Sequence, residues 1–197
     1  NWADILACLC TFDFGFGGRY GVYHSAYDSF NWMDRYGDPG YLSHAAAARM
    51  AAIAVTRLSN ADLLPFDYAE FGRALGQVIS KRRTQAAASG MSIPGWSGLD
   101  SAVSRLVDAG TRLDSLLTAV GAVSGRRAPN AVALAAANDS LRVAEQAFVR
   151  PEGIPGRPFY RNILFAPGRD DGYGAVGLPG LEGAIADGNA ALAASEV

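Results

Sequence analysis

The residues most able to do chemistry lie in the segment from Gly21 to Phe30, which contains His24, one of only two histidines in the chain. The segment is rich in small and polar residues, so we expect a turn there. A loop imidazole can bind a metal or a substrate, but it can equally be a structural histidine bonded to the backbone. Ser25 follows directly, yet no nucleophile-elbow motif and no His–Asp partnership supports a serine hydrolase. The residues alone leave the metal or substrate role and the structural role open.

Few other residues could complete a catalytic site. His44 stands in an Ala-rich helical stretch and is interpreted as a core or surface helix residue. Cys8 and Cys10 are too close in sequence for an ordinary disulfide. The run Gly15–Gly18 is not followed by the helix that a phosphate-binding glycine loop requires. A catalytic zinc needs about three protein ligands and an open position, so His24 alone would bind stray metal only weakly. We therefore expect no enzyme activity from this chain by itself.

Composition excludes several other classes. The 197 residues carry 17 basic and 19 acidic side chains, so no global field favours nucleic acid or anionic lipid. The one basic cluster, Lys81–Arg83, is short and is interpreted as a solvated helix face. Half of the residues are hydrophobic, enough for a sizeable core, but no apolar run reaches the roughly 20 residues that span a bilayer. The chain is expected to be one domain, or one domain plus a fragment, without a membrane segment.

The elements that must position these residues are mostly helices. Asp38 is predicted to cap a helix that starts at Pro39 and runs to about Leu63, where Pro65 stops it. Three more helices follow by apolar periodicity, over residues 68–89 with Asp67 as cap, 99–123, and 129–148. Before them, Trp2–Leu9 has a helical pattern and Thr11–Gly15 alternates like a strand end. Residues 151–179 are irregular and rich in Pro and Gly, and 180–194 return to a weak helical pattern. This order predicts a mainly α fold, a four-helix up-down bundle.

Several ordered sequence words resemble the glutamate carboxypeptidase II and transferrin receptor family. The resemblance covers nearly the whole chain and is greatest to plant and fungal members. It rests on Tyr23–Phe30 with Gly37–Gly40, Arg57-Leu58 with Leu64–Phe66, Glu145 and Phe148 with Pro158–Arg161, Ala166-Pro167, and Leu178–Gly180.

The resemblance implies a fold and a partner. Residues 1–34 correspond to the end of an α/β zinc-peptidase domain, and residues 35–197 to the helical dimerisation domain, with the Pro/Gly-rich loop at 151–179. Such a domain forms a homodimer and closes one side of the active site. Both ends of the chain look like the ends of a fragment. The resemblance implies an extracellular, lumenal or vacuolar location, and any membrane anchor is expected outside this chain.

The resemblance also assigns site residues. His24 matches a ligand of the family's two-zinc site, and Tyr23 matches a tyrosine that lines the substrate pocket. The remaining ligands and the general-base glutamate match regions upstream of this chain, so a peptide substrate is expected only for the parent protein. Gly172 and Tyr173 match a Lys-Tyr pair that grips the substrate's terminal glutamate in glutamate carboxypeptidase II. Without the lysine, strong glutamate selectivity is not expected.

Two hypotheses follow from these residues. The chain is a helical dimerisation and active-site-closing domain of a glutamate carboxypeptidase II-like zinc peptidase, not catalytic by itself. Alternatively, it is one part of an active zinc-dependent carboxypeptidase or aminopeptidase whose other zinc ligands lie upstream.

Overall fold

The computed structural model describes residues 15–18, 20–123 and 130–197, which divide between two compact units. One unit runs from Phe12 to Asp62, and the other includes Leu63 to Val197. The predictions for Trp2–Leu9 and Thr11–Gly15, and both cysteines, lie outside the described residues. The predicted boundary at residues 34 and 35, between peptidase remnant and helical domain, stays a prediction.

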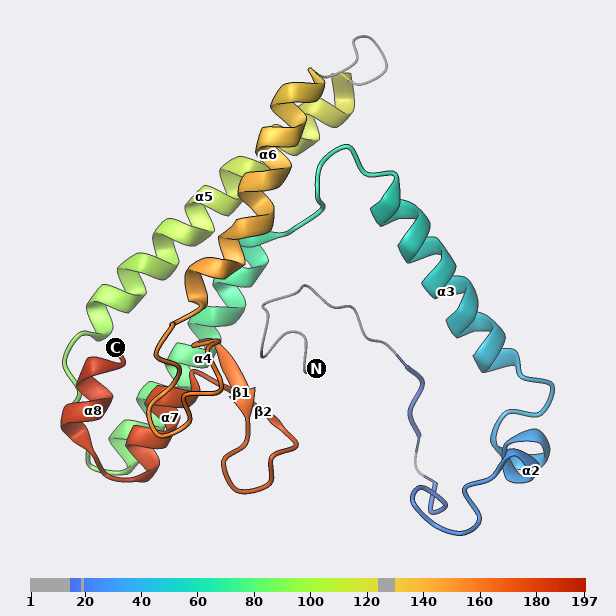
Figure 1. Ribbon diagram of the computed structural model, residues 1–197, viewed down its shortest axis with the longest axis horizontal. Coiled ribbons are helices and arrows are strands. Elements are labelled where there is room, and N and C mark those ends of the chain that lie inside the picture. Colours follow the sequence, from blue (N-terminus) through green and yellow to red (C-terminus); the bar gives the residue numbers. More distant parts are fainter. Residues whose placement is uncertain (1–14, 19, 124–129) are drawn as a thin grey trace. The chain divides into compact units, whose positions relative to one another are not determined.

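The first unit is built around α3, Leu42–Ser59, after the short α2, Phe30–Trp32, and a π-helical turn η1, Met33–Gly37 (Figure 1). The predicted start of α3 at Pro39 is wrong. Tyr41 adopts a left-handed conformation with φ 56° and precedes the first helical residue. Asp38 still caps the helix, because its carboxylate accepts the backbone N–H groups of Ser43 and His44 at 3.1 and 3.0 Å. The cap therefore acts across an intervening turn rather than from the adjacent residue.

The second unit is held together by a pair of long helices, α4, Tyr68–Ala88, and α5, Trp96–Val123. Asp67 caps α4 as predicted, accepting the N–H of Glu70 at 2.7 Å. The two helices approach closely because glycines lie between them: a Cβ on Gly110 would meet the backbone of Tyr68 at 2.6 Å, and one on Gly72 would meet Val107 Cγ2 at 2.8 Å. Such contacts leave no room for a side chain.

A third helix, α6, Ala131–Ala144, continues into a 3-10 turn η2, Glu145–Phe148, and lies along the same unit (Figure 1). Two hydrogen bonds join it to the start of α4. The N–H of Leu64 donates to Asn138 Oδ1 at 2.9 Å, and the Tyr68 hydroxyl donates to the carbonyl of Leu141 at 2.8 Å. The first helix of the predicted bundle corresponds to α3, which belongs to the other unit. A mainly α fold is confirmed, whereas a four-helix bundle is not.

The C-terminal region closes the second unit. Two short strands, β1, Phe165–Pro167, and β2, Ala175–Gly177, pair antiparallel within the segment predicted to be irregular. The predicted final helix is broken into α7, Pro179–Ala186, and α8, Ala190–Ser195, by Gly188 at φ 67°. These helices and the end of α4 form the core, with Ala86, Ile93, Leu181, Ala184, Ile185 and Ala193 buried together and Trp96 packed against them.

An ion pair fixes the end of the chain. Glu196, whose side chain is 8% exposed, accepts Arg150 Nη1 at 2.7 Å and Arg150 Nη2 at 3.2 Å. The hydrogen bond that Arg150 donates to Glu196 raises the pKa of Arg150. Because Arg150 follows η2, the pair joins α8 to the loop that leaves α6.

We expect Gly110→Ala to lower the free energy of unfolding by about 1–3 kcal/mol, because the added methyl group meets α4 backbone rather than a movable side chain. Gly98→Ala, in the same helix, is the matched control. No atom lies within 4 Å of a Cβ there. Alanine should therefore be neutral or stabilise by up to about 1 kcal/mol. Urea unfolding measures both, and an equal effect of the two substitutions would contradict the close approach of α4 and α5.

Candidate functional site

The segment around His24 forms a tight exposed turn. The Ser25 N–H and hydroxyl both donate to the carbonyl of Val22, at 2.9 and 2.7 Å. His24 adopts φ 61°, and its N–H donates to Asp28 Oδ2 at 3.4 Å. Its ring stacks on Tyr23 with centroids 3.8 Å apart. A positive φ is uncommon outside glycine, and among the described residues His24 shares it with Tyr41 and Leu178. The left-handed backbone is thus compatible with a functional turn but does not by itself assign one.

Tyr173 lies in the other unit, at the tip of the loop between β1 and β2. Its side chain is 86% exposed, and its N–H donates to Asp171 Oδ1 at 3.1 Å. The loop is closed by the Gly168 N–H, which donates to the carbonyl of Gly174 at 2.7 Å. Gly172 adopts φ 64°, a conformation that a lysine would enter only with strain. Tyr23 and His24 therefore lie together in the first unit, whereas Tyr173 belongs to the second.

A buried arginine supports this hairpin. Arg82 is 5% exposed, and its Nε and Nη2 both donate to the carbonyl of Gly177 in β2, at 2.9 and 2.6 Å. Burial lowers its pKa. The interpretation of Lys81–Arg83 as a solvated face is therefore wrong for Arg82. The sequence signal was weak, because one helix position decides which member of a basic triplet points inward.

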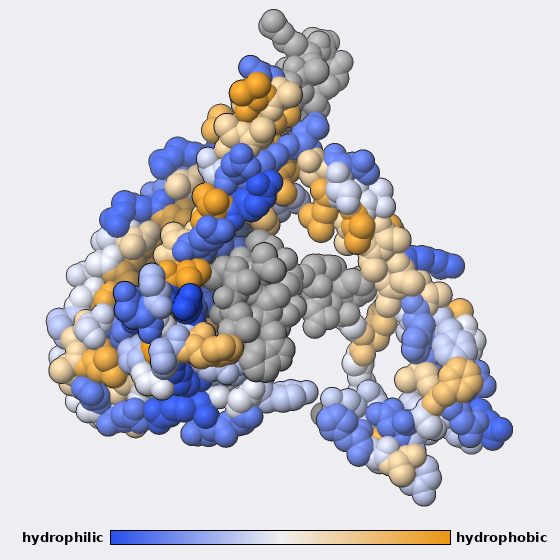
Figure 2. All heavy atoms as spheres, in the orientation of Figure 1, coloured by the Kyte–Doolittle hydropathy of each residue, from blue (hydrophilic) through white to orange (hydrophobic). Residues whose placement is uncertain are grey.

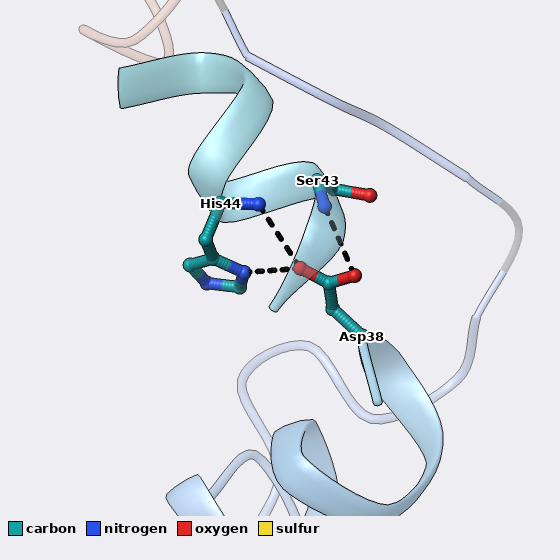
Figure 3. A network of polar contacts seen from close by, with 3 residues as sticks. All are labelled: Asp38, Ser43 and His44. Atoms are coloured by element: carbon teal, nitrogen blue, oxygen red, sulfur yellow. Dashed lines mark hydrogen bonds and ion pairs between the residues drawn. The ribbon is translucent and has the colours of Figure 1, made fainter. Parts of the chain in front are cut away.

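His44 makes a contact that the sequence did not reveal. Its Nδ1 lies 2.6 Å from Asp38 Oδ2, the same oxygen that accepts its backbone N–H (Figure 3). These hydrogen bonds, the side-chain one above all, hold the pKa of Asp38 well below its usual range, although burial opposes the shift. His44 is half-exposed and thus a surface helix residue that fixes the cap of α3.

The described residues do not fit a complete zinc site. Among residues 15–18, 20–123 and 130–197, no three His, Cys, Asp or Glu side chains converge to hold a metal ion. His24 and His44, the two histidines, have separate environments, since His24 stacks on Tyr23 and His44 pairs with Asp38. A zinc site that used His24 would need ligands from elsewhere.

Large apolar side chains remain exposed on the long helices. In the second unit Leu116 on α5 is 64% exposed, and Val132 and Val143 on α6 are 78% and 51% exposed. Val132 and Val143 are eleven residues apart, three helical turns, so they lie on one face of α6. The α3 helix of the first unit has no buried residue. Figure 2 shows apolar side chains at the surface of α6 and of α3.

Among the described helices, none is both long and apolar enough to cross a bilayer.

The fold and surface therefore define a helical scaffold that presents exposed apolar faces and carries an isolated histidine turn. Comparison with known proteins agrees. The sequence profile of the transferrin receptor-like dimerisation domain matches residues 95–197. The chain belongs to this family, and it is a helical dimerisation domain of the kind found in glutamate carboxypeptidase-like peptidases.

Curated relatives bear this out. A probable glutamate carboxypeptidase of Arthroderma benhamiae is 30% identical over 189 residues, 92% of this chain and 25% of that protein. Probable glutamate carboxypeptidase LAMP1 of Arabidopsis thaliana is 28% identical over 173 residues, 88% of this chain and 24% of that protein. Aminopeptidase NAALADL1 of Rattus norvegicus is 28% identical over 168 residues, 85% of this chain and 22% of that protein. The chain spans about a quarter of the length of these relatives.

We expect acid to disrupt the α3 cap. The pKa of Asp38 is depressed in the folded chain, so its stabilising contribution is complete above the ordinary value of 3.8 and is lost as the pH falls from there through the folded pKa. The amide proton shifts of Ser43 and His44, followed from about pH 6 to about pH 1, should move upfield together as the cap is protonated, at a lower pH than exposed carboxylates titrate. Asp38→Asn keeps an acceptor oxygen and should abolish this shared titration. Unchanged shifts in the parent chain, or an equal titration in the variant, would contradict the assignment.

Proposed function

We propose that this domain pairs two copies of the chain through the apolar face that α5 and α6 leave exposed. The supporting observation is the exposure of Leu116, Val132 and Val143 within the range matched by the dimerisation family. The opposite face of α6 is already used, because Asn138 and Leu141 bond to the start of α4. Val132 and Val143 share one face of α6, and large exposed apolar patches on a folded domain are typical of an association site. A two-fold axis would bury the same patch of each copy against its mate.

Charging this face should weaken pairing. Leu116→Glu and Val132→Glu, made singly and together, place a carboxylate on helices that tolerate Glu well. We expect each to raise the dimer dissociation constant at least about tenfold, because a charge would be buried without a partner. Ala74→Glu, exposed on α4 outside the matched range, is the control and should leave it unchanged. Sedimentation velocity over a concentration series measures the constant. Wild-type association in the double variant would exclude this face.

We further propose that the parent protein is a zinc-dependent exopeptidase to which this chain contributes His24 as a metal ligand and Tyr23 and Tyr173 as substrate-pocket residues. Three observations support the proposal: the similarity to a probable glutamate carboxypeptidase and an aminopeptidase, the stacking of Tyr23 on the left-handed His24, and the exposure of Tyr173. Gly172, whose φ suits glycine, supports a pocket without a cation at that position. The substrate would then be a peptide whose terminal residue is not selected strongly for a glutamate side chain.

The chain alone should not be an enzyme. With zinc added, we expect it to hydrolyse neither N-acylated dipeptides nor aminoacyl substrates, because one imidazole cannot hold a catalytic metal. In the longer protein, His24→Ala should lower bound zinc and activity together, while His44→Ala, whose ring serves the α3 cap, should spare the zinc content. Metal analysis and peptide hydrolysis measure the two effects. Full zinc content in the His24 variant would remove this residue from the site.

A further inference from the structure

A pocket of about 280 Å³ opens where α6 and η2 meet the start of α4, within the second unit. Its side chains come from three places in the sequence, since Leu106 of α5 also lines it. The volume exceeds the roughly 150 Å³ in which an engineered apolar protein cavity binds benzene. The pocket can therefore hold a small organic molecule.

Aromatic rings form much of the lining, and contacts hold them in place. Phe66 and Tyr68 meet edge to face with centroids 5.9 Å apart, and Phe71 and Phe148 do the same at 5.8 Å. The hydrogen bond from the Tyr68 hydroxyl to Leu141 fixes a third point. Rings held in this way form a preorganised site, which costs a ligand little ordering of the protein. Their faces carry negative electrostatic potential, which attracts cations.

The charged groups of the lining have one sign. The two charged residues among those that line the pocket, Asp67 and Glu145, are both acidic, and no basic residue is among the described lining residues. Asp67 is held in place because its Oδ1 accepts the N–H of Glu70 at 2.7 Å. Carboxylates beside aromatic rings suit a ligand that joins a positive charge to an apolar group, and they disfavour an anion of the same shape.

We propose that this pocket binds a small organic cation, an ammonium group attached to an aromatic or aliphatic substituent. The apolar part packs among Phe66, Phe71 and Phe148, and the ammonium group lies toward Asp67 and Glu145. The site is independent of the proposed peptidase role, because it uses none of Tyr23, His24 and Tyr173. It is also distinct from the proposed pairing face of Leu116, Val132 and Val143.

Three ligands of nearly equal shape test the charge preference on the full chain. Phenethylamine is cationic at neutral pH, 2-phenylethanol is neutral and 3-phenylpropionate is anionic. Titrations followed by ¹H–¹⁵N correlation spectra should give a dissociation constant of about 1 mM or tighter for phenethylamine, as expected for a ligand of this size. The neutral ligand should bind at least about fivefold more weakly and the anion more weakly still. Shifts should be confined to amides of residues 66–71, 106 and 144–148.

Two variants remove the charge while keeping the shape. Glu145→Gln is isosteric, and Asp67→Asn retains an oxygen that can cap α4. Each should weaken phenethylamine at least about threefold and leave 2-phenylethanol unchanged. Glu152→Gln, exposed and outside the pocket, is the control. Wild-type-like spectra of the free variants establish that each is folded. The proposal would be overturned by equal binding of all three ligands or by unchanged phenethylamine affinity in both variants. Shifts of amides elsewhere, or no binding at about 10 mM, would also overturn it.

Discussion

The close approach of α4 and α5 is the constraint on which the second unit depends. Gly110 lies against the backbone at the start of α4, and Gly72 lies against Val107, so the two helices pack with almost no side chain between them at these points. Tyr68 at the start of α4 and Leu64 just before it form hydrogen bonds with α6. Ala86, near the end of α4, packs in the core with α7 and α8. Moving the two long helices apart would disturb both ends of the unit.

Much of this architecture could be predicted from local sequence signals. Asp67 followed by an amphipathic stretch fixed the start of α4, and the apolar periodicity of residues 99–123 identified α5 within three residues. The start of α3 was predicted wrongly at Pro39, because a proline that suits a first helical turn also suits a turn before the helix. That turn places the Asp38 carboxylate beside the N–H groups of Ser43 and His44. The β1–β2 pair was missed because its strands have three residues each, too few to show alternation. Neither the inward position of Arg82 nor the pocket at Phe148 has a local signal, since each depends on helix packing.

The candidate site likewise combines features that local sequence predicts with features that depend on residues far away in the chain. The turn at His24 could be predicted from its composition, whereas its left-handed backbone and the stacking of its ring on Tyr23 could not. Its role depends on ligands that the described residues do not supply. The dimerisation role, by contrast, rests on surface within this chain: apolar side chains exposed on α5 and α6, in the range that the dimerisation family matches. The described residues therefore provide exposed apolar surface for association, whereas they do not provide the ligands of a complete metal site.

We propose that the exposed apolar side chains of α5 and α6 join two copies of the chain. Isotope-filtered nuclear Overhauser spectroscopy on a mixture of methyl-labelled and unlabelled chains detects contacts between copies alone. We expect intermolecular contacts from the methyl groups of Val132, Val143 and Leu116, since all three are exposed within one copy. Intermolecular contacts that involve only α3 or α4, or none at concentrations where the chain sediments as a dimer, would contradict the claim.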